Sequence, residues 1–370
     1  MSFGVTDPKN EESATASRAL GSPRLSTLAF GAIPVVALTV LATVPKIPFT
    51  DISLTVPYAA EGPGPVFDTL SEVDGQPVVS IDGTQVDQTS GELNMTTVSV
   101  RTQMTLAQAL ARWATTDDTI VPIEQVIPPN HSPEDIEEQN KAAFTRSESA
   151  ATIAALNHLG RPVKVTVAEL VEDSPAQGVL APEDVITSVD AQPVSTPGQV
   201  QELVRAKKPG DSVALGIRRG ETDRTVELEL AESPKNKSVP MLGILMISTP
   251  ADGVSVEYNL QDVGGPSAGM MFSLAVIDKL SPGELNGGHN VAGTGTISEN
   301  GEIGPIGGIQ HKVTAAHGEG AELFLAPKAN CQEALAGNHG DMAIASVETL
   351  DDSIHAMEAF SSGKDFPRCS

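Results

Sequence analysis

Hydrophobic positions along this 370-residue chain fall into blocks of different period. Residues 26–44, "STLAFGAIPVVALTVLATV", form a run without a single charge. From about residue 47, short apolar stretches alternate with Asp-Gly turns, a pattern typical of β-strands. Apolar positions then recur at helical spacing in "TLAQALARWA". The pattern therefore predicts one apolar helix followed by a β-rich segment with helices over residues 47–150.

The apolar run at 26–44 has about the length that crosses the hydrocarbon core of a bilayer. Arg18 and Arg24 precede it and Lys46 alone follows closely. This charge bias predicts residues 1–25 as a cytoplasmic tail and the remainder as extracytoplasmic. We therefore expect a single-pass transmembrane helix that anchors the chain in the cell membrane. A cleaved signal peptide stays an alternative, and a buried core helix is disfavoured because the run is apolar on all sides.

Two helices are expected within the β-rich segment. In the first, Leu106, Leu110 and Trp113 fall on one face, which indicates a contact with the core. The second is predicted from "PPNHSPEDIEEQNKAAF", where Pro and Ser precede acidic residues, a pattern typical of a helix N-terminus. It should continue toward residue 157. Two arrangements stay open for 47–150: strands packed on a later domain, or a spacer from the membrane.

The rest of the chain divides into two modules. Residues 160–232 read as short strands and one helix, and a polar linker "SPKNK" follows. Residues 239–368 alternate strands and helices, and Asn300-Gly301 is a strong hairpin signal. The expected fold class is α+β or α/β.

Charge and motifs exclude several functions. The formal net charge of −25 leaves no basic surplus for binding nucleic acid. The chain contains neither HExxH nor a phosphate-binding GxxxxGK[ST] motif, so we expect no metal, no cofactor and no ATPase. Cys331 and Cys369 follow no metal or redox spacing. We expect a buried Cys331 and an unpaired Cys369, with a disulfide between them as the alternative.

The stretch "VGGPSAGMMFSL" places Ser267 at the start of a predicted helix. Gly265 lacks a Cβ and would let a substrate backbone approach, while backbone N–H groups around Ser267 and Ala268 could stabilise an oxyanion. A serine is equally a favoured helix cap, worth ~1 kcal/mol. The same stretch also matches the G-x-S-x-G nucleophile-elbow motif of α/β-hydrolases, although no HGGG-type motif precedes it.

Lys312 lies on a predicted helix that begins near residue 309. Ile309 and Ala316 share its side of that helix, so the amine falls among apolar residues. A lysine titrates near ~10.4 in water and must be desolvated to act as a base. The alternative is a lysine whose head reaches water while its stem covers apolar surface.

Together, "GGPSAG" and "TGTISENGEIGPIGGIQHK" closely resemble the nucleophile and lysine motifs of Lon-type proteolytic domains. The resemblance implies a dyad of Ser267 and Lys312, with Thr294 nearby to position it. Residues 160–232 resemble bacterial PDZ domains, through "DSPA", "DVITSVD" and "PGDSVAL". The combination resembles membrane-anchored PDZ-Lon proteins of bacteria.

This resemblance implies an ATP-independent serine endopeptidase that acts on unfolded or flexible proteins and peptides. The PDZ domain would capture the substrate by adding it as a strand to a sheet edge. Lon-type domains often assemble into rings, so a homo-oligomer is compatible with the resemblance. The competing hypothesis is a membrane-tethered binding protein or scaffold without catalysis.

Overall fold

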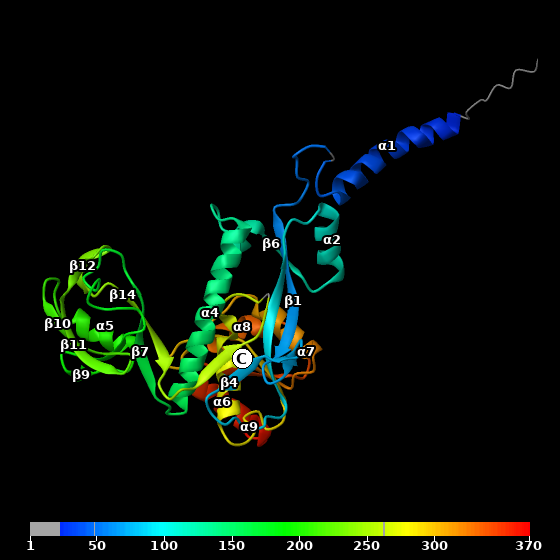
Figure 1. Ribbon diagram of the computed structural model, residues 1–370. Coiled ribbons are helices and arrows are strands. Elements are labelled where there is room, and N and C mark those ends of the chain that lie inside the picture. The colour runs from blue at the N-terminus through cyan, green and yellow to red at the C-terminus, as the bar shows by residue number, and fades with distance from the viewer. Residues whose placement is uncertain (1–22, 48, 262) are drawn as a thin grey trace, which may run out of the picture.

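The computed structural model describes residues 23–47, 49–261 and 263–370. Figure 1 shows a main body, a smaller β-rich lobe beside it, and the long helix α4 (Pro133–His158) between the two. Helix α1 (Pro23–Thr43) projects away from the main body. The predicted cytoplasmic tail lies outside the described residues as far as residue 22.

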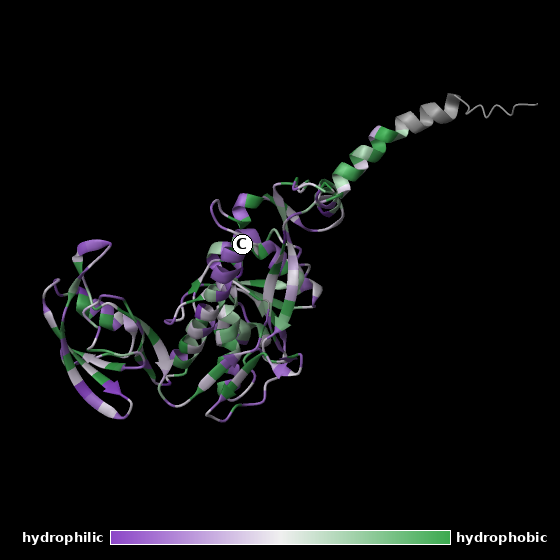
Figure 2. Cartoon of the chain, turned by 45° about the horizontal axis from the view of Figure 1, so that its top comes forward, coloured by the Kyte–Doolittle hydropathy of each residue, from purple (hydrophilic) through white to green (hydrophobic). Residues whose placement is uncertain are grey.

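The prediction of a transmembrane helix at 26–44 is wrong. Helix α1 includes residues 26–43 of that range, and its part beyond residue 31 is largely green in Figure 2. Crossing a bilayer requires both sufficient length and sufficient apolarity. Within the described part of the chain, no helix meets the two requirements together. The predicted localisation in the cell membrane, with an extracytoplasmic catalytic domain, is contradicted by the same finding.

The main body is built around a six-stranded sheet in the order β20-β19-β16-β5-β1-β6. Strand β16 runs parallel to β5 and β19, and β19 runs parallel to β20, whereas β1 is antiparallel to both β5 and β6. Its strands are β1 (Tyr58–Asp68), β5 (Glu92–Arg101), β6 (Thr119–Pro122), β16 (Asn290–Gly293), β19 (Leu323–Pro327) and β20 (Ala343–Val347). Strands from 58–122 thus share one sheet with strands beyond 290, so the early segment packs on the later domain.

Helices cover both faces of this sheet. Successive strand residues point to opposite faces, so Val291 packs in one core cluster and Ala292 in another. The first cluster joins the sheet to α4, α6 (Gly269–Leu280) and α9 (Leu350–Ser361); the second joins it to α7 (Ile309–Gly318) and α8 (Cys331–Ala334). Helix α6 therefore lies between the sheet and α4.

The smaller lobe contains a sheet in the order β11-β10-β8-β7-β14, with one helix, α5 (Pro197–Arg205). Its strands are β7 (Val163–Leu170), β8 (Val185–Val189), β10 (Ser212–Arg219), β11 (Thr222–Glu229) and β14 (Ile244–Pro250), and β9 (Gln192–Pro193) pairs with β8. The edge strand β14 lies in the range predicted for the following module, yet it pairs with β7. A hairpin, β12 (Ala231–Ser233) and β13 (Asn236–Met241), leads into it.

Shorter elements complete the fold. They are β2 (Glu72–Val73), β3 (Gln76–Pro77), β4 (Val79–Asp82), α2 (Leu106–Thr115), α3 (Ile123–Val126), β15 (Ser255–Tyr258), η1 (Pro266–Ala268), β17 (Thr296–Ile297), β18 (Ile303–Gly304) and η2 (Lys328–Asn330). The predicted hairpin is confirmed: β17 pairs with β18, and Gly301 takes a positive φ of 84° in the turn. The predicted start of α4 is also confirmed, since Ser132 and Asp135 form a capping box there.

Two further expectations are wrong. Helix α2 exists, but Leu110 and Trp113 are 54% and 69% exposed instead of packing in the core. Cys331 and Cys369 form a disulfide, with their Cα atoms 5.0 Å apart. Backbone hydrogen bonds hold the C-terminal segment along β20, because the Cys369 N–H donates to the Ile344 carbonyl at 3.0 Å. The tail is therefore fixed where the sulfur atoms can meet.

Candidate active site

Ser267 lies in the short helix η1, at the entrance to α6. The preceding Gly265 takes a φ of +85°, a conformation that side chains disfavour, and its N–H donates to the Asn140 carbonyl at 2.9 Å. The Ser147 hydroxyl donates to the Pro266 carbonyl at 3.0 Å. Both bonds come from α4, which therefore fixes the segment that carries Ser267.

Ser267 does not cap helix α6. The N-cap position belongs to Ala268, which is buried, and no side-chain capping bond is made at the start of either η1 or α6. The Ser267 hydroxyl instead lies 2.8 Å from the Lys312 amine. The helix-cap hypothesis for this serine is therefore wrong.

Lys312 lies in the first turn and a half of α7, which begins after Gly308 in the left-handed region at φ +67°. Helical side chains lean toward the N-terminus, so Lys312 reaches back toward η1. Only 3% of the residue is exposed, and Ile309 and Ala316 beside it are fully buried. The amine does not reach water, so the alternative of a solvated head is wrong.

Three oxygen atoms surround the Lys312 amine. Nζ lies 2.8 Å from Ser267 Oγ, 3.0 Å from Thr294 Oγ1 and 2.9 Å from the Thr96 carbonyl oxygen. Among the described residues, no carboxylate lies within hydrogen-bonding distance of this amine. Burial lowers the pKa of the Lys312 amine to about 7.

The surrounding hydrogen bonds determine where each hydrogen of a neutral Lys312 amine points. The Thr96 carbonyl can only accept, and Thr294 Oγ1 uses its own hydrogen to donate to the Ser267 carbonyl at 3.1 Å. Both oxygens therefore accept hydrogens from Lys312. A neutral amine has two hydrogens and one lone pair, so the lone pair is left for the Ser267 hydroxyl.

Thr294 is fully buried just after β16 and joins the two halves of the site. Beside its bond to the Ser267 carbonyl, the Gly295 N–H donates to the same oxygen at 3.0 Å. The Met270 N–H then donates to the Gly295 carbonyl at 3.2 Å. The segment after β16 thus holds the backbone of Ser267 in register with α6.

Sequence reasoning missed Thr96 on β5 and the contribution of α4. Thr96 contributes a backbone carbonyl, which every residue type has, so its letter carries no signal. Asn140 likewise acts through its carbonyl, and Ser147 lies 119 positions before the proline that it binds. Strand pairing brings the Thr96 carbonyl to Lys312, and the packing of α4 on η1 brings Asn140 and Ser147 to the segment that carries Ser267.

A cavity of about 320 Å³ opens beside Ser267 and Lys312. Most of its lining is apolar, including Phe67, Met95 and Phe144. Gly265 and Ala268 also line it. The geometry therefore brings all five residues singled out in the sequence to one place, because Thr294 contacts both Ser267 and Lys312.

The smaller lobe carries a groove of about 230 Å³ between α5 and β14. Val200 and Val204 line it from the helix, and Ile244 and Met246 from the strand. Because β14 is an edge of its sheet, backbone groups on this side are open to pairing. Within the described residues, no group of three or more His, Cys, Asp and Glu side chains is placed to hold a metal ion.

Comparisons with known proteins agree with both modules. Residues 136–230 match the model of the PDZ domain, and residues 261–358 match that of the Lon protease (S16) C-terminal proteolytic domain. The Lon protease of Campylobacter concisus is 37% identical over 92 residues, and that of Haemophilus influenzae is 40% identical over 91 residues. Each match covers 24% of this chain and 11% of the relative, so the chain spans a small part of those proteins.

Solved PDZ domains are also similar. That of an SdrC-like protein from Listeria innocua is 30% identical, covers 22% of this chain and 92% of that chain, and has a TM-score of 0.21. The family matches confirm the predicted resemblance to both modules and support a peptidase. The predicted boundaries at 160, 232 and 239 stay predictions.

Proposed function

We propose that this chain, which combines a PDZ domain with a Lon-type proteolytic domain, is an ATP-independent serine endopeptidase with Ser267 as nucleophile and Lys312 as general base. The observation that carries the proposal is the buried Lys312 amine 2.8 Å from the Ser267 hydroxyl. With its pKa lowered to about 7, this amine has a neutral fraction near physiological pH. A lysine of ordinary pKa would be almost entirely charged and could not take the proton.

The reaction proceeds in two halves. Ser267 Oγ attacks the scissile carbonyl carbon while its proton passes to Lys312 Nζ, and backbone N–H groups around Ala268 stabilise the oxyanion. The C–N bond breaks as Lys312 returns the proton to the leaving amine. Water then attacks the acyl carbonyl carbon while its proton passes to Lys312 Nζ. The bond from this carbon to Ser267 Oγ breaks, Lys312 returns the proton to Oγ, and the second product leaves with a new carboxyl group. Thr294 positions the amine and the serine throughout.

The substrate class follows from the cavity and from the motifs in the chain. The lining by Phe67, Met95 and Phe144 favours an apolar side chain next to the scissile bond. The sequence contains no phosphate-binding GxxxxGK[ST] motif through which ATP hydrolysis could drive the unfolding of a substrate. We therefore propose peptides and unfolded or flexible proteins as substrates. A homo-oligomer stays a prediction from the resemblance, and light scattering tests it.

The groove between α5 and β14 is the proposed capture site of the PDZ domain. An extended peptide would pair with the open edge of β14 and place an apolar side chain between Val204 and Met246. The positive φ of Gly243, at 75°, turns the backbone at one end of this groove. Backbone N–H groups exposed by such a turn can bind a terminal carboxylate, so we expect a free C-terminus as the captured end.

The test is covalent labelling by a serine-reactive probe at pH 8, read by mass spectrometry. The proposal expects Ser267 to be modified in the intact protein and labelling to disappear in Lys312→Ala. Ser267→Ala should fold and lose all peptide cleavage. Full cleavage by Ser267→Ala would contradict the assignment of Ser267 as the nucleophile. A folded wild type that binds peptides but shows neither labelling nor cleavage would favour the non-catalytic scaffold.

A further inference from the structure

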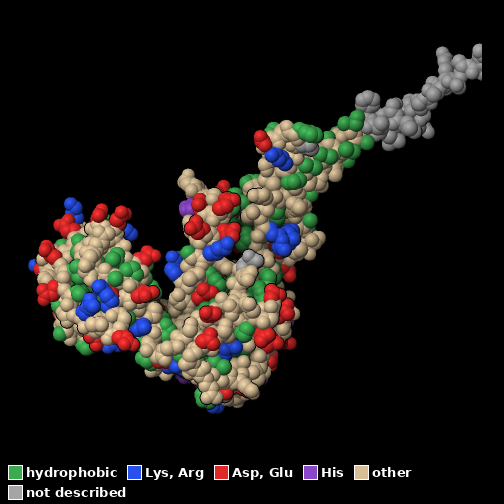
Figure 3. All heavy atoms as spheres, viewed as in Figure 1, with side chains coloured by type: hydrophobic (Ala, Val, Ile, Leu, Met, Phe, Trp, Pro, Cys, Tyr) green, Lys and Arg blue, Asp and Glu red, His purple; other side chains and the backbone are tan. Residues whose placement is uncertain are grey.

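We propose that a cleft along α4 binds the stretch of substrate between the end held in the PDZ groove and the scissile bond, and that it favours basic residues there. The inference rests on the proposed function and extends it to the course and charge of the substrate. The cleft has a volume of about 790 Å³ and lies between α4, β14, β15 and the turn that carries Glu299. Figure 3 shows the molecule hollowed between the smaller lobe and the column formed by α4.

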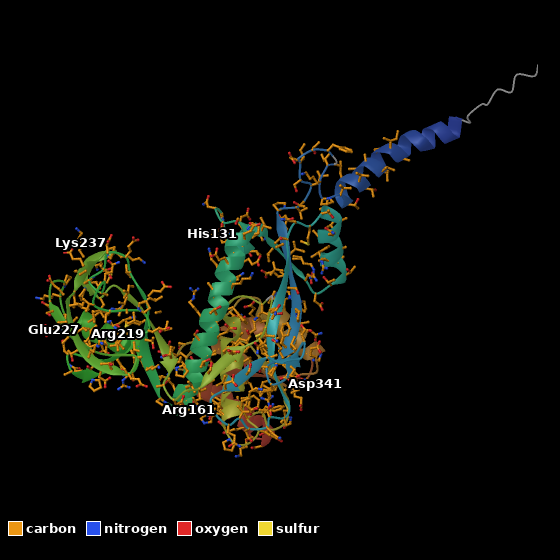
Figure 4. All side chains as sticks on the ribbon, in the orientation of Figure 1. His131, Arg161, Arg219, Glu227, Lys237 and Asp341 are labelled. Carbon is orange, nitrogen blue, oxygen red and sulfur yellow. A yellow bond between two sulfur atoms is a disulfide. The ribbon has the colours of Figure 1, made fainter. Side chains whose placement is uncertain are left out.

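The cleft has fixed walls. Arg161, which Figure 4 labels just after α4, pairs with Asp252 at 2.6 Å where the chain returns from β14. The two segments that connect the lobe to the main body therefore lie side by side. Ser248 on β14 also donates to the Glu299 carboxylate at 2.6 Å. Two polar contacts thus hold the lobe against the main body, and one of them, Ser248 with Glu299, lies in the lining of the cleft.

Strand β14 leads from the PDZ groove into this cleft. Ile244 and Met246, in its first half, line the groove, whereas Ile247–Pro250, in its second half, line the cleft. One edge of β14 is paired with β7 and the other is open. A peptide that pairs with the open edge antiparallel, with its C-terminus near Gly243, would extend its upstream residues directly into the cleft.

The cleft in turn leads toward Ser267. It shares Arg146 and Ala150 with a cavity of about 260 Å³, and that cavity shares Pro266 with the one beside Ser267. From the cleft onward, the cavities follow α4, which contributes lining residues to all three. An extended chain can therefore run from the PDZ groove to the nucleophile along described surface.

The charge of the cleft indicates what it binds. Among the described residues that line it are three carboxylates, Glu148, Glu257 and Glu299, and one cation, Arg146. Glu257 is exposed on β15, an edge strand of a two-stranded sheet that can pair with an extended chain. Burial raises the pKa of the Glu148 carboxyl to about 7, and a nearby cation would favour its charged form. A segment with Lys or Arg is therefore complementary to this wall.

The path has a definite length. Along β14 it covers roughly 20 Å at about 3.4 Å per residue, and along α4 from Ile153 to Phe144 it covers roughly 14 Å at about 1.5 Å per residue. An extended peptide spans this distance with roughly ten residues. A shorter substrate cannot bind in the PDZ groove and reach Ser267 at the same time.

The experiment uses internally quenched peptides with one apolar cleavage site and a free C-terminus. Spacers of about 4, 10 and 16 residues separate the two, each in a Lys-containing and a Glu-containing version, and a short peptide without spacer gives the reference. We expect KM to fall about tenfold between the 4- and 10-residue spacers, and the Lys version to have a several-fold lower KM than the Glu version. Amidation of the C-terminus should remove the advantage.

Glu257→Gln tests the charge, and Glu227→Gln is its matched control. Within the described residues no donor binds the Glu257 carboxylate, so its replacement breaks no bond. Glu227 is also exposed, and it lies on β11 at the far edge of the lobe (Figure 4). We expect the ratio of KM for the Glu and Lys spacers to shrink several-fold in Glu257→Gln only. A KM independent of spacer length, or equal ratios in the two variants, would overturn the inference.

The two levels of proposal fail differently. Cleavage of the short peptide by the wild type but not by Ser267→Ala, together with no spacer effect, overturns the cleft and leaves the endopeptidase intact. No cleavage of the short peptide, or undiminished cleavage by Ser267→Ala, overturns the proposed function and with it the cleft.

Discussion

Lys312 Nζ and Ser267 Oγ lie 2.8 Å apart, and 45 residues of chain separate them. The remaining hydrogen-bonding directions of the amine are taken by the Thr96 carbonyl and Thr294 Oγ1. A neutral Lys312 consequently has a single direction in which it can accept a proton, and that direction is toward the serine.

The pH dependence of cleavage should report the Lys312 amine. The base must be neutral, and its pKa is lowered to about 7. We therefore expect kcat/KM for a short peptide to rise about tenfold per pH unit below pH 7 and to level off above it. Stopped assays between pH 5.5 and 9 would measure this. A rate that stays constant between pH 6 and 8 would contradict the assignment of the base.

Replacing Lys312 by Met should stabilise the fold at neutral pH. Lowering the pKa from 10.5 to about 7 corresponds to roughly 5 kcal/mol of unfavourable burial, an upper bound for the gain. The unfolded chain binds more protons between pH 7 and 10.5, so the free energy of unfolding of the wild type rises with pH in that window. Denaturant titrations should show the advantage of Lys312→Met shrinking from pH 7 to pH 10. A constant difference would contradict the lowered pKa.

Thr294 is expected to act as a positioning residue. Thr294→Val removes an acceptor from the Lys312 amine, whereas Thr294→Ser keeps the hydroxyl. Because a hydrogen-bond acceptor favours the charged amine, its loss should lower the midpoint of the pH profile below 7 and reduce kcat by 10- to 100-fold. The serine variant should remain within about threefold of the wild type. Equal pH midpoints in all three proteins would indicate a purely structural role.

The packing of α6 beneath the nucleophile leaves no room for an added methyl group. A Cβ on Gly269 would lie 2.6 Å from Ile297 Cγ2 and 2.7 Å from Ser147 Oγ, so Gly269→Ala should cost about 1–3 kcal/mol and reduce kcat. Gly318 at the end of α7 has no neighbour within 4 Å of such an atom, which makes Gly318→Ala the control. Thermal unfolding and peptide assays compare the two. A fully active, stable Gly269→Ala would contradict this packing.

The disulfide should stabilise the described C-terminal segment. Cys331 and Cys369 close a loop of 38 residues, for which the chain-entropy model gives about 4 kcal/mol. The double variant Cys331→Ser and Cys369→Ser should lower the free energy of unfolding by up to that amount. Oxidised wild type provides the reference in the same denaturant titration, and equal midpoints would contradict a stabilising disulfide.

Local signals in the sequence predicted local structure well. Ser132 with Asp135 marked the start of α4, and Asn300-Gly301 marked a hairpin, because caps and turns depend on neighbours a few residues away. Ser267 and Lys312 were identified through sequence motifs because their reactive groups belong to the side chains, and the residue type is therefore visible in the sequence. That Ser267 and Lys312 lie close together is nevertheless a property of the sheet. Strand β16 lies between β5 and β19 and brings η1 and α7 together.

Long-range pairings were the part that the sequence could not reveal. The stripe Leu106, Leu110 and Trp113 has the same helical period whether it faces a core or solvent, so its exposure was missed. The pairing of β14 with β7 depends on strands more than 70 residues apart, and no local pattern records it. The disulfide was missed for a similar reason, because the tail is held by hydrogen bonds to β20.

Through strand β14, the sheet of the smaller lobe depends on residues that follow the family match. The family match ends at residue 230, but the sheet is completed only at Pro250. A fragment cut at the family boundary would lose one wall of the peptide groove and uncover the edge of β7, a common cause of aggregation. The unit that folds must therefore include the segment that enters the proteolytic domain. If β14 binds substrate as proposed, any force on the bound chain would act directly on the connection between the two domains.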